Sequence, residues 1–402
     1  MKTNRNELEF PLHRVKAIIA KWLSLEDDRI IEVMLAVIVA NQLQTDPNWL
    51  LLIGPPSHAK TELLRSLDGH SKAYFLSNLT PATLVSGVKQ KKGQENPSLI
   101  FKLDSKTVVL KDFTTVLSMR SENQAEILSQ LREIYDGQYS KAFGNGIVVD
   151  WKGHVGLIGA VTPVYDKHYA VIGSLGDRFL LYRTGNSDGQ AVGLQAQKIV
   201  GYEDKMRTEI REAVHKFLDQ FNDLGNIQFQ NNDTVNHMIV DLACFVAYGR
   251  CPVERDYRNQ NIQYLPMPEG TPRLVKQFMQ VGMGLGLING KQAIDLAVYE
   301  TIKKIGRDLL PAHRLKILKH LYDQNVFEYM GEWQKTKDIA DQVNIPASTT
   351  KIALEDLMIV GVLNRSVDGD SERSPYKWQI NEKAYNMINK SEVFEVSKGI
   401  PF

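Results

Sequence analysis

Residues 49–61 read Trp-Leu-Leu-Leu-Ile-Gly-Pro-Pro-Ser-His-Ala-Lys-Thr, and this stretch decides the fold class. The apolar run 49–53 is typical of a strand buried on both faces of a sheet. The residues after it have the pattern of a loop whose backbone N–H groups cradle phosphates at the start of a helix. In such a loop Lys60 contacts the β- and γ-phosphates, and the Thr61 hydroxyl holds Mg²⁺. The residues expected to bind a nucleotide are Gly54, Pro55, Pro56, Ser57, His58, Ala59, Lys60 and Thr61.

The loop departs from the usual pattern at Ala59, which stands where a glycine is normally found. Alanine is the smallest change from glycine and is compatible with a helix, so we expect a minor effect. The apolar run before the loop and the helical pattern after it favour a phosphate-binding loop over a chance match.

A later strand end carries the acidic residue that a nucleotide site needs. Residues 108–112 read Val-Val-Leu-Lys-Asp, an apolar run that ends in a single acid, Asp112. The usual pattern ends in two acids, one for Mg²⁺ and one that polarises water. Asp112 can serve either task, so the sequence also leaves open a weakly hydrolysing or nucleotide-gated protein.

Further apolar runs predict four more strands, with helical patterns between them. These strands are expected at 74–76, 107–110, 155–161 and 179–182. Helical spacing is clearest at 121–135. Strands that alternate with helices predict a parallel sheet and therefore an α/β fold. We expect this nucleotide-binding domain at 46–190, after an N-terminal helical segment at 1–45.

The pattern changes twice after residue 190. Residues 191–308 are expected to form a helical lid, with helices at 195–221, 233–248, 272–287 and 290–306. Residues 309–402 then predict a helix-turn-helix followed by a β-wing. Helices are expected there at 314–322, 337–343 and 348–360, and strands at 361–365 and 376–380.

Two more residues have positions that fit a nucleotide site. Thr162 follows the apolar run 155–161, and a polar residue at such a strand end can sense the γ-phosphate. Arg178, before the next strand, is expected to act as an arginine finger on the nucleotide of a neighbouring subunit. Arg183 is the second choice, and a surface ion pair is the alternative for Arg178.

The order of these parts resembles the AAA+ superfamily: loop at 54–61, acid at Asp112, sensor at Thr162, finger at Arg178, helical lid. The stretch 139–151, with Gly-Asn-Gly at 144–146, indicates a β-hairpin. It is similar to the pre-sensor hairpin of MCM-type helicases. The lid stretch 271–278 is similar to the sensor-2 helix of those proteins, and a C-terminal winged helix also matches them.

The resemblance covers roughly residues 45–380. It implies an AAA+ P-loop ATPase core with an all-α lid and a C-terminal winged helix. It also implies ATP as the ligand, Mg²⁺ held by Thr61 and Asp112, and a homo-oligomeric ring that we expect to be hexameric. The residues it implies in catalysis are Lys60, Asp112, Thr162, Arg178 and Arg273.

Three departures from the MCM pattern bear on this comparison. Residues 1–45 are expected to be helical, where MCM proteins have an oligonucleotide-binding domain. Lys111-Asp112 stands in place of the acidic pair, with the lysine at the position of the magnesium aspartate. The lysine at the hairpin tip is replaced by Gly144-Asn145, with Lys141 nearby. Phage and mobile-element proteins that pair an AAA+ core with a winged helix have this general plan.

Two basic loops can face the pore of a ring and bind single-stranded DNA through its phosphates. Solvated surface lysines are the alternative interpretation. The residues concerned are Lys89, Lys91 and Lys92 in one loop, and Lys141 and Lys152 in the hairpin.

The winged helix is expected to contact DNA through its second helix and its wing. The expected contacts are Ser348, Thr349 and Lys351 on the helix, and Arg365, Arg373 and Lys377 on the wing. Yet residues 309–402 contain twelve Lys and Arg against thirteen Asp and Glu, whereas DNA-binding domains are usually basic. DNA and a protein partner therefore both remain open.

Composition limits the wider setting. The formal net charge of the 402-residue chain is +1, so any DNA contact has to come from local patches. Two cysteines, Cys244 and Cys251, are too few for a disulfide framework, and we expect free thiols on one helix in a reducing cytoplasm. The longest apolar run, 33–40, is too short to span a bilayer, and the first ten residues do not resemble a secretory signal.

These features lead to two functional hypotheses. The first is an ATP-driven ring motor on DNA, a helicase or replication initiator of a phage or mobile element. The second is an ATP-gated regulatory or remodelling protein, in transcription or phage defence, whose winged helix binds DNA or a partner. The hairpin favours the first, and the single acid favours the second. A catalytically silent scaffold that only binds nucleotide is a third possibility.

Overall fold

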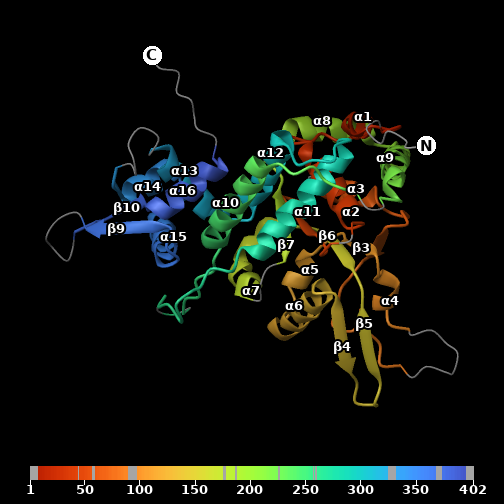
Figure 1. Cartoon of the computed structure of the whole chain (residues 1–402), viewed down its shortest axis with the longest axis horizontal. Coiled ribbons are helices and arrows are strands. Elements are labelled where there is room, and N and C mark those ends of the chain that lie inside the picture. The colour runs from red at the N-terminus through yellow and green to blue at the C-terminus, as the bar shows by residue number, and fades with distance from the viewer. Residues whose placement is uncertain are drawn as a thin grey trace. The chain divides into compact units, whose positions relative to one another are not determined.

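The computed structural model describes residues 8–43, 45–56, 59–88, 97–174, 178–185, 188–224, 227–256, 258, 260–324, 332–367 and 374–394. The chain divides into two compact units (Figure 1). Unit 1 contains Met1–His168, Leu175–Asn231 and Met279–Thr301. Unit 2 contains Tyr169–Ser174, Asn232–Phe278 and Ile302–Phe402. No helix in these described stretches is long and apolar enough to cross a membrane.

A five-stranded parallel sheet forms the centre of unit 1 and confirms the predicted α/β fold. Its strands, in spatial order, are β2 Ala73–Leu76, β3 Lys106–Leu110, β6 Val155–Val161, β1 Trp49–Ile53 and β7 Phe179–Arg183. All five residues of β1 and all seven of β6 are buried, which explains why both read as unbroken apolar runs. Because the strands are parallel, the segments after β1, β3, β6 and β7 meet at one edge of the sheet.

Helices pack around this sheet. They are α1 Leu12–Trp22, α2 Arg29–Ala40, α3 Lys60–Arg65, α4 Ile100–Leu103, α5 Thr114–Leu117, α6 Ser121–Tyr135, α8 Gly189–Ile199 and α9 Glu203–Leu218, with 3-10 turns at Pro163–Lys167 and Asp219–Phe221. The single helix predicted at 195–221 is wrong. The helix ends after Ile199, because Val200 leaves the helical conformation, with ψ 121°, and Gly201 has φ +83°, a left-handed conformation that ends a helix.

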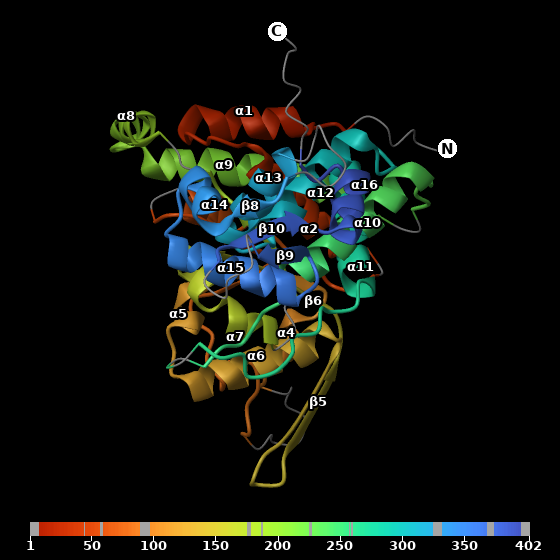
Figure 2. The ribbon, with the colours of Figure 1, turned by 90° about the vertical axis from the view of Figure 1, so that its left-hand side faces the viewer.

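The hairpin predicted at 139–151 is confirmed as an antiparallel pair, β4 Gln138–Ala142 and β5 Val148–Lys152. Gly146 has φ +83° at its tip, a conformation that glycine adopts without strain. Figure 2 shows the hairpin extending away from the sheet. Asn145 donates from Nδ2 to the Gly87 carbonyl at 2.6 Å, so the tip lies against the segment that precedes residues 89–96.

Unit 2 is mainly helical with a small antiparallel sheet. Its elements are α7 Tyr169–Ser174, α10 Asp233–Gly249, α13 Ala312–Asp323, α14 Thr336–Val343, α15 Ala347–Ile359, α16 Glu382–Ser391 and the strands β8 Gln334–Lys335, β10 Tyr376–Ile380 and β9 Leu363–Val367. Two longer helices, α11 Pro272–Ile288 and α12 Leu296–Asp308, belong partly to each unit. The left-handed Asn344, with φ +53°, makes the turn between α14 and α15.

The helices and strands predicted between 314 and 380 are therefore present, within a few residues of their expected bounds. Two other expectations are wrong. The helix predicted from Gly290 begins at Leu296, after a left-handed Gly290 with φ +71°. Cys251 lies beyond the end of α10, so the two cysteines do not share a helix; both are free.

Candidate functional site

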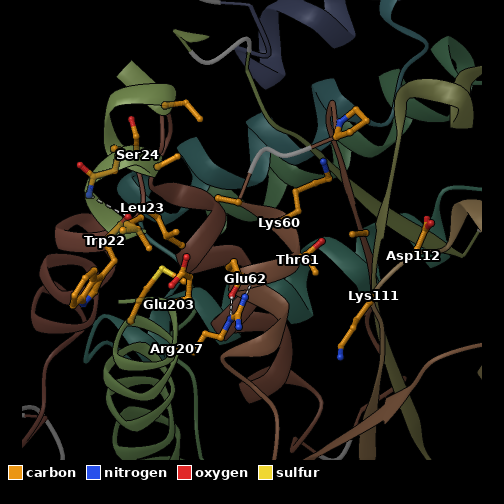
Figure 3. A pocket seen from close by; sticks show the side chains of 18 of the residues that line it. Trp22, Leu23, Ser24, Lys60, Thr61, Glu62, Lys111, Asp112, Glu203 and Arg207 are labelled. Atoms are coloured by element: carbon orange, nitrogen blue, oxygen red, sulfur yellow. Dashed lines mark hydrogen bonds and ion pairs between the residues drawn. The ribbon is translucent and has the colours of Figure 1, made fainter. Parts of the chain in front are cut away.

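A cavity of about 640 Å³ lies at the carboxyl edge of the sheet, entirely within unit 1. One wall comes from the start of α3 and the ends of β3 and β6, where the residues are Lys60, Thr61, Lys111, Asp112 and Thr162. The opposite wall comes from the end of α1, from α8 and from α9 (Figure 3). Residues predicted from three separate strand ends therefore share one cavity of a size suited to a small ligand.

The loop after β1 depends on a close approach at Gly54. A Cβ at this position would lie 2.0 Å from Thr184 Oγ1 and 3.4 Å from Lys60 Nζ, so only glycine fits. Thr184, directly after β7, donates its N–H to the Ile53 carbonyl at 2.8 Å. The sequence motif identified Gly54, but it gave no indication of Thr184.

Lys60 is the buried cation of the cavity. Its Nζ donates to the Gly54 carbonyl at 2.7 Å and to the Pro55 carbonyl at 2.6 Å. Burial lowers the pKa of the Lys60 ammonium, and the negative charge of Asp112 opposes that shift. Burial of a cation without an anion in direct contact is unfavourable, so an anionic ligand would be stabilised here.

Ala59 adopts φ +53°, in the left-handed region, directly before α3. This explains why glycine is usual at this position, since left-handed backbone is strained for a residue with a Cβ. The expectation of a minor effect rested on the helix compatibility of alanine, and this reason does not apply: Ala59 precedes the helix in a conformation that helices do not use.

Asp112 and Thr162 lie at neighbouring strand ends. The exposed Asp112 accepts the Thr114 N–H through Oδ1 at 2.9 Å. Thr162 donates its N–H to Thr114 Oγ1 at 3.3 Å, and its own Oγ1 is buried with no hydrogen-bond partner among the described residues. Lys111 holds its ammonium 5.4 Å from the centre of the Phe75 ring and points away from Asp112 (Figure 3).

The wall opposite the loop is largely apolar, and the sequence did not predict it. Its apolar side chains are Trp22, Leu23, Val192, Ala196, Ile199 and Met206. Gln195 holds α8 against the end of α1, because its Nε2 donates to the carbonyls of Lys21 at 2.9 Å and Trp22 at 3.1 Å. The available signal was the spacing of 192, 195, 196 and 199, which places one face of α8 toward the cavity.

One ion pair joins the two walls. Arg207 on α9 lies 3.0 Å from Glu62 on α3, measured from Nε to Oε2 (Figure 3). Both residues line the cavity. The α9 helix is thereby tied to the helix that begins with Lys60.

Arg178, Arg183 and Arg273 are not among the described residues that line the cavity. Arg178 precedes β7 at the opposite edge of the sheet, about 16 Å along the strand, and pairs with Asp136 at 3.0 Å. Arg183, the second choice, pairs with Asp166 at 2.6 Å. Arg273 belongs to unit 2, where it pairs with Glu269.

The predicted DNA contacts are only partly described. Lys141 lies on the hairpin with its Nζ 3.1 Å from Glu126 Oε1, and Lys152 is exposed at the end of β5. The predicted residues outside the described part of the chain are Ser57, His58, Lys89, Lys91, Lys92 and Arg373.

The predicted contacts at the C-terminal end lie on surfaces. Ser348, Thr349 and Lys351 are exposed in the first turns of α15. The guanidinium of Arg365 lies 4.6 Å from the Tyr376 ring centre. Lys377 is half-buried on β10, opposite Lys335 of β8.

Two acids of α15 are engaged within the protein. Asp356 lies 2.7 Å from Arg255 and 3.0 Å from Arg314, and Glu355 lies 3.4 Å from Arg255. Glu355 also lies 3.9 Å from Lys351. The exposed start of α15 therefore carries a single cation, Lys351, and that cation has an acid nearby.

No protein-family model and no curated protein sequence matches this chain. What the cavity binds must therefore be inferred from its own residues.

Proposed function

We propose that the cavity binds ATP with Mg²⁺ and that the chain is an ATPase of the AAA+ type, with a helical lid and a C-terminal winged helix. The observation that carries this proposal is the convergence of Lys60, Thr61, Asp112 and Thr162 on one cavity that has an apolar wall opposite them. A triphosphate needs cations and hydroxyls at one end, and a purine base needs an apolar slot at the other.

At the phosphate end, the surroundings of each residue suit the contact with ATP that we propose for it. The ammonium of Lys60 now bonds two backbone carbonyls, and it would exchange them for phosphate oxygens. Thr61 and Asp112 would hold Mg²⁺, which neutralises charge that develops on the phosphates. The hydroxyl of Thr162, which has no partner among the residues that the structure describes, would donate to the γ-phosphate and so distinguish ATP from ADP.

At the base end, the apolar side chains of α1, α8 and α9 would enclose the adenine. The pair Arg207–Glu62 ties α9 to α3, so binding of the base and of the phosphates would be coupled through these helices. The contributions of α8 and α9 to the cavity support their role as part of a lid.

We favour an ATP-driven ring motor on DNA, a helicase or replication initiator. The projecting hairpin supports this, because a ring would turn Lys141 and Lys152 toward a strand in its pore. Arg178 would act on the neighbouring subunit's ATP, and Arg273 would approach a phosphate. Arg178 would first have to break its ion pair with Asp136. Formation of the ring would therefore be linked to the loss of this ion pair.

A second function is favoured by one specific observation, the pair Lys111-Asp112. A lysine occupies the place of the second acid, and its ammonium is held over the Phe75 ring instead of contacting Asp112. A site with one acid suits slow hydrolysis, and then ATP would set the assembly state of a regulatory or remodelling protein. The exposed start of α15 would recruit DNA or a protein partner.

The two functions are separated by measuring ATP hydrolysis with and without single-stranded DNA, together with displacement of a labelled strand. The motor predicts stimulation by DNA and strand displacement, both lost in Lys60→Ala. Hydrolysis that DNA does not stimulate, with no displaced strand, would contradict the motor and favour the regulator. Absence of ATP binding would contradict both.

A further inference from the structure

Two histidines from distant parts of the chain meet inside unit 1. His70 lies between α3 and β2, and His215 lies in α9. Their ring centres are 5.1 Å apart, and the ring planes meet at 67°. The side chain of His70 is only 2% exposed. The pair therefore joins the segment that follows α3 to the helix that forms part of the cavity wall.

Each ring uses Nδ1 for a contact with the backbone, and this contact fixes its neutral tautomer. His70 Nδ1 accepts the Lys72 N–H at 3.3 Å, so the proton of the neutral ring is on Nε2. His215 donates to the backbone carbonyl of Asp68, so its proton is on Nδ1. The Nε2 atom of His215 is therefore a lone pair, and it is buried without a partner among the described residues.

The surroundings limit what can complete these ring nitrogens. Asp219 Oδ1 lies 3.4 Å from His70 Nε2, a distance longer than an ordinary hydrogen bond. In the described part of the chain, no group of three or more His, Cys, Asp or Glu could hold a metal ion. The ligand that this cluster can take up is therefore a proton, which would add a positive charge to a buried pair of rings.

The packed pair resists that charge. Burial lowers the pKa of His70 and the pKa of His215, and a charge on one ring also disfavours a charge on the other. The charged groups that face the pair are Lys72 and Arg211, which oppose protonation, and Asp68 and Asp219, which favour it. A histidine in water has a pKa of about 6.5, so the separated rings bind protons more tightly than the packed pair. Separation therefore becomes more favourable as the pH falls below about 6.5.

We propose that His70 and His215 form a pH-sensitive junction, which holds α9 against the segment after α3 at neutral pH and releases it in acid. Eight residues earlier in α9, about 12 Å along the helix, Arg207 pairs with Glu62 of α3 beside the cavity. Release of α9 at the junction would therefore disturb the wall to which Met206 and Arg207 belong, and would weaken nucleotide binding. This link to nucleotide rests on the proposed function; the junction itself does not.

The first test uses a full-length double variant, His70→Asn with His215→Asn. Asparagine cannot be protonated in this pH range, and its amide can keep the backbone contact that each Nδ1 makes. Hydrogen exchange of the α9 amides is measured at pH 7 and pH 5 and corrected for the intrinsic exchange rates. Between these values the protection of α9 should fall at least about tenfold more in wild type than in the double variant. His13→Gln, at an exposed position of α1, is the control and should behave like wild type.

A second variant, Asp219→Asn, changes the pH dependence in the opposite direction and keeps both histidines. Without this carboxylate the packed pair takes up a proton less readily, whereas the separated rings are unaffected. Between pH 7 and pH 5 the α9 amides should therefore lose more protection than in wild type. A purely structural role of Asp219 would instead lower the protection equally at both pH values, and that result would overturn the proposal.

The link to the cavity is tested by calorimetry with Mg²⁺-ATP at the same two pH values. Protonation of the nucleotide affects both proteins alike, so the informative quantity is the affinity of the double variant divided by that of wild type. This ratio should be at least about twofold higher at pH 5 than at pH 7, because released α9 reduces the fraction of wild type that can bind.

Each result has a separate consequence. Equal loss of α9 protection in wild type and in the double variant would overturn the junction. An affinity ratio that does not change with pH would overturn its link to the cavity. Wild type that binds no ATP at either pH would contradict the proposed function, whereas hydrogen exchange would still decide whether the junction exists.

Discussion

The cavity of unit 1 and the exposed face of α15 in unit 2 both contain polar residues that the sequence singled out, but these residues differ in burial and in their partners. In the cavity, Lys60 is buried and the Thr162 hydroxyl lacks a partner among the described residues. On α15, Ser348, Thr349 and Lys351 are exposed. The buried polar residues of α15 are instead fully engaged, as with Asp356 and its two arginines.

The difference shows which polar residues need a functional explanation. Burial of a cation or a hydroxyl without a matching partner lowers stability, so such groups persist where a ligand completes them. Exposed polar residues are satisfied by water and need no ligand. The cavity therefore carries the functional proposal, and the exposed residues of α15 give no comparable support for a DNA contact.

The largest change in stability is expected at Asp356, the buried acid of α15. Asp356→Ala leaves Arg314 buried without its carboxylate, which should lower the free energy of unfolding by about 3–5 kcal/mol. Chemical denaturation measures this change. Glu355→Ala is the control, because the half-buried Glu355 makes only a longer contact of 3.4 Å with Arg255, and its loss should cost about 1 kcal/mol. Equal effects of the two substitutions would contradict the structural role of Asp356.

The next effect concerns the close approach at Gly54. Gly54→Ala forces a Cβ to within 2.0 Å of Thr184 Oγ1, so unfolding free energy should fall by about 1–3 kcal/mol and ATP affinity by at least about tenfold. Adding Thr184→Ala removes that oxygen, leaves the nearest Thr184 atom at 3.2 Å and should restore part of both losses. A double variant no better than the single one would show that Thr184 does not restrict the loop.

Thr162→Val should move stability and function in opposite directions. Valine keeps the shape of threonine and removes a buried hydroxyl that has no partner in the described protein, so unfolding free energy should stay the same or rise by about 1 kcal/mol. Preference for ATP over ADP should fall about tenfold, as one lost hydrogen bond predicts. Thr349→Val, at an exposed position of α15, is the control and should leave nucleotide preference unchanged. Lower stability with unchanged nucleotide preference would contradict the role of Thr162.

The smallest effect is expected at Ala59. Ala59→Gly relieves a left-handed alanine and should raise the unfolding free energy by about 0.5–1 kcal/mol. Thermal unfolding measures it, with Ala196→Gly in α8 as a control that should be destabilising by a similar amount. Destabilisation by Ala59→Gly would mean that the residue is not left-handed.

Local patterns in the sequence predicted much of this structure. The run 49–53, the loop after it, the single acid at Asp112, the hairpin and the helix–turn–helix order after 336 all follow from short-range spacing. These features depend on residues close to one another in the chain. Among them, the loop after β1 and Asp112 share one cavity with Thr162, because parallel strands end at the same edge of a sheet.

The rest depends on contacts between distant parts of the chain. The apolar wall joins the end of α1 to α8, some 170 residues later. The sequence pattern predicted a single helix at 195–221, but Gly201 separates α8 from the next helix. Thr184 and Gly54 come together only through strand pairing. The spacing of 192, 195, 196 and 199 showed a face on α8, but it could not show what that face covers.

The most direct test of the proposal that the cavity binds ATP is a calorimetric titration of wild type and Lys60→Ala with Mg²⁺-ATP, with Lys152→Ala as an exposed-lysine control. Wild type and the control are predicted to bind equally. Lys60→Ala should bind about 100-fold more weakly, because charge-assisted hydrogen bonds to phosphate contribute about 1.5–3 kcal/mol each. Equal affinity of Lys60→Ala and wild type, or no binding by wild type, would contradict the account.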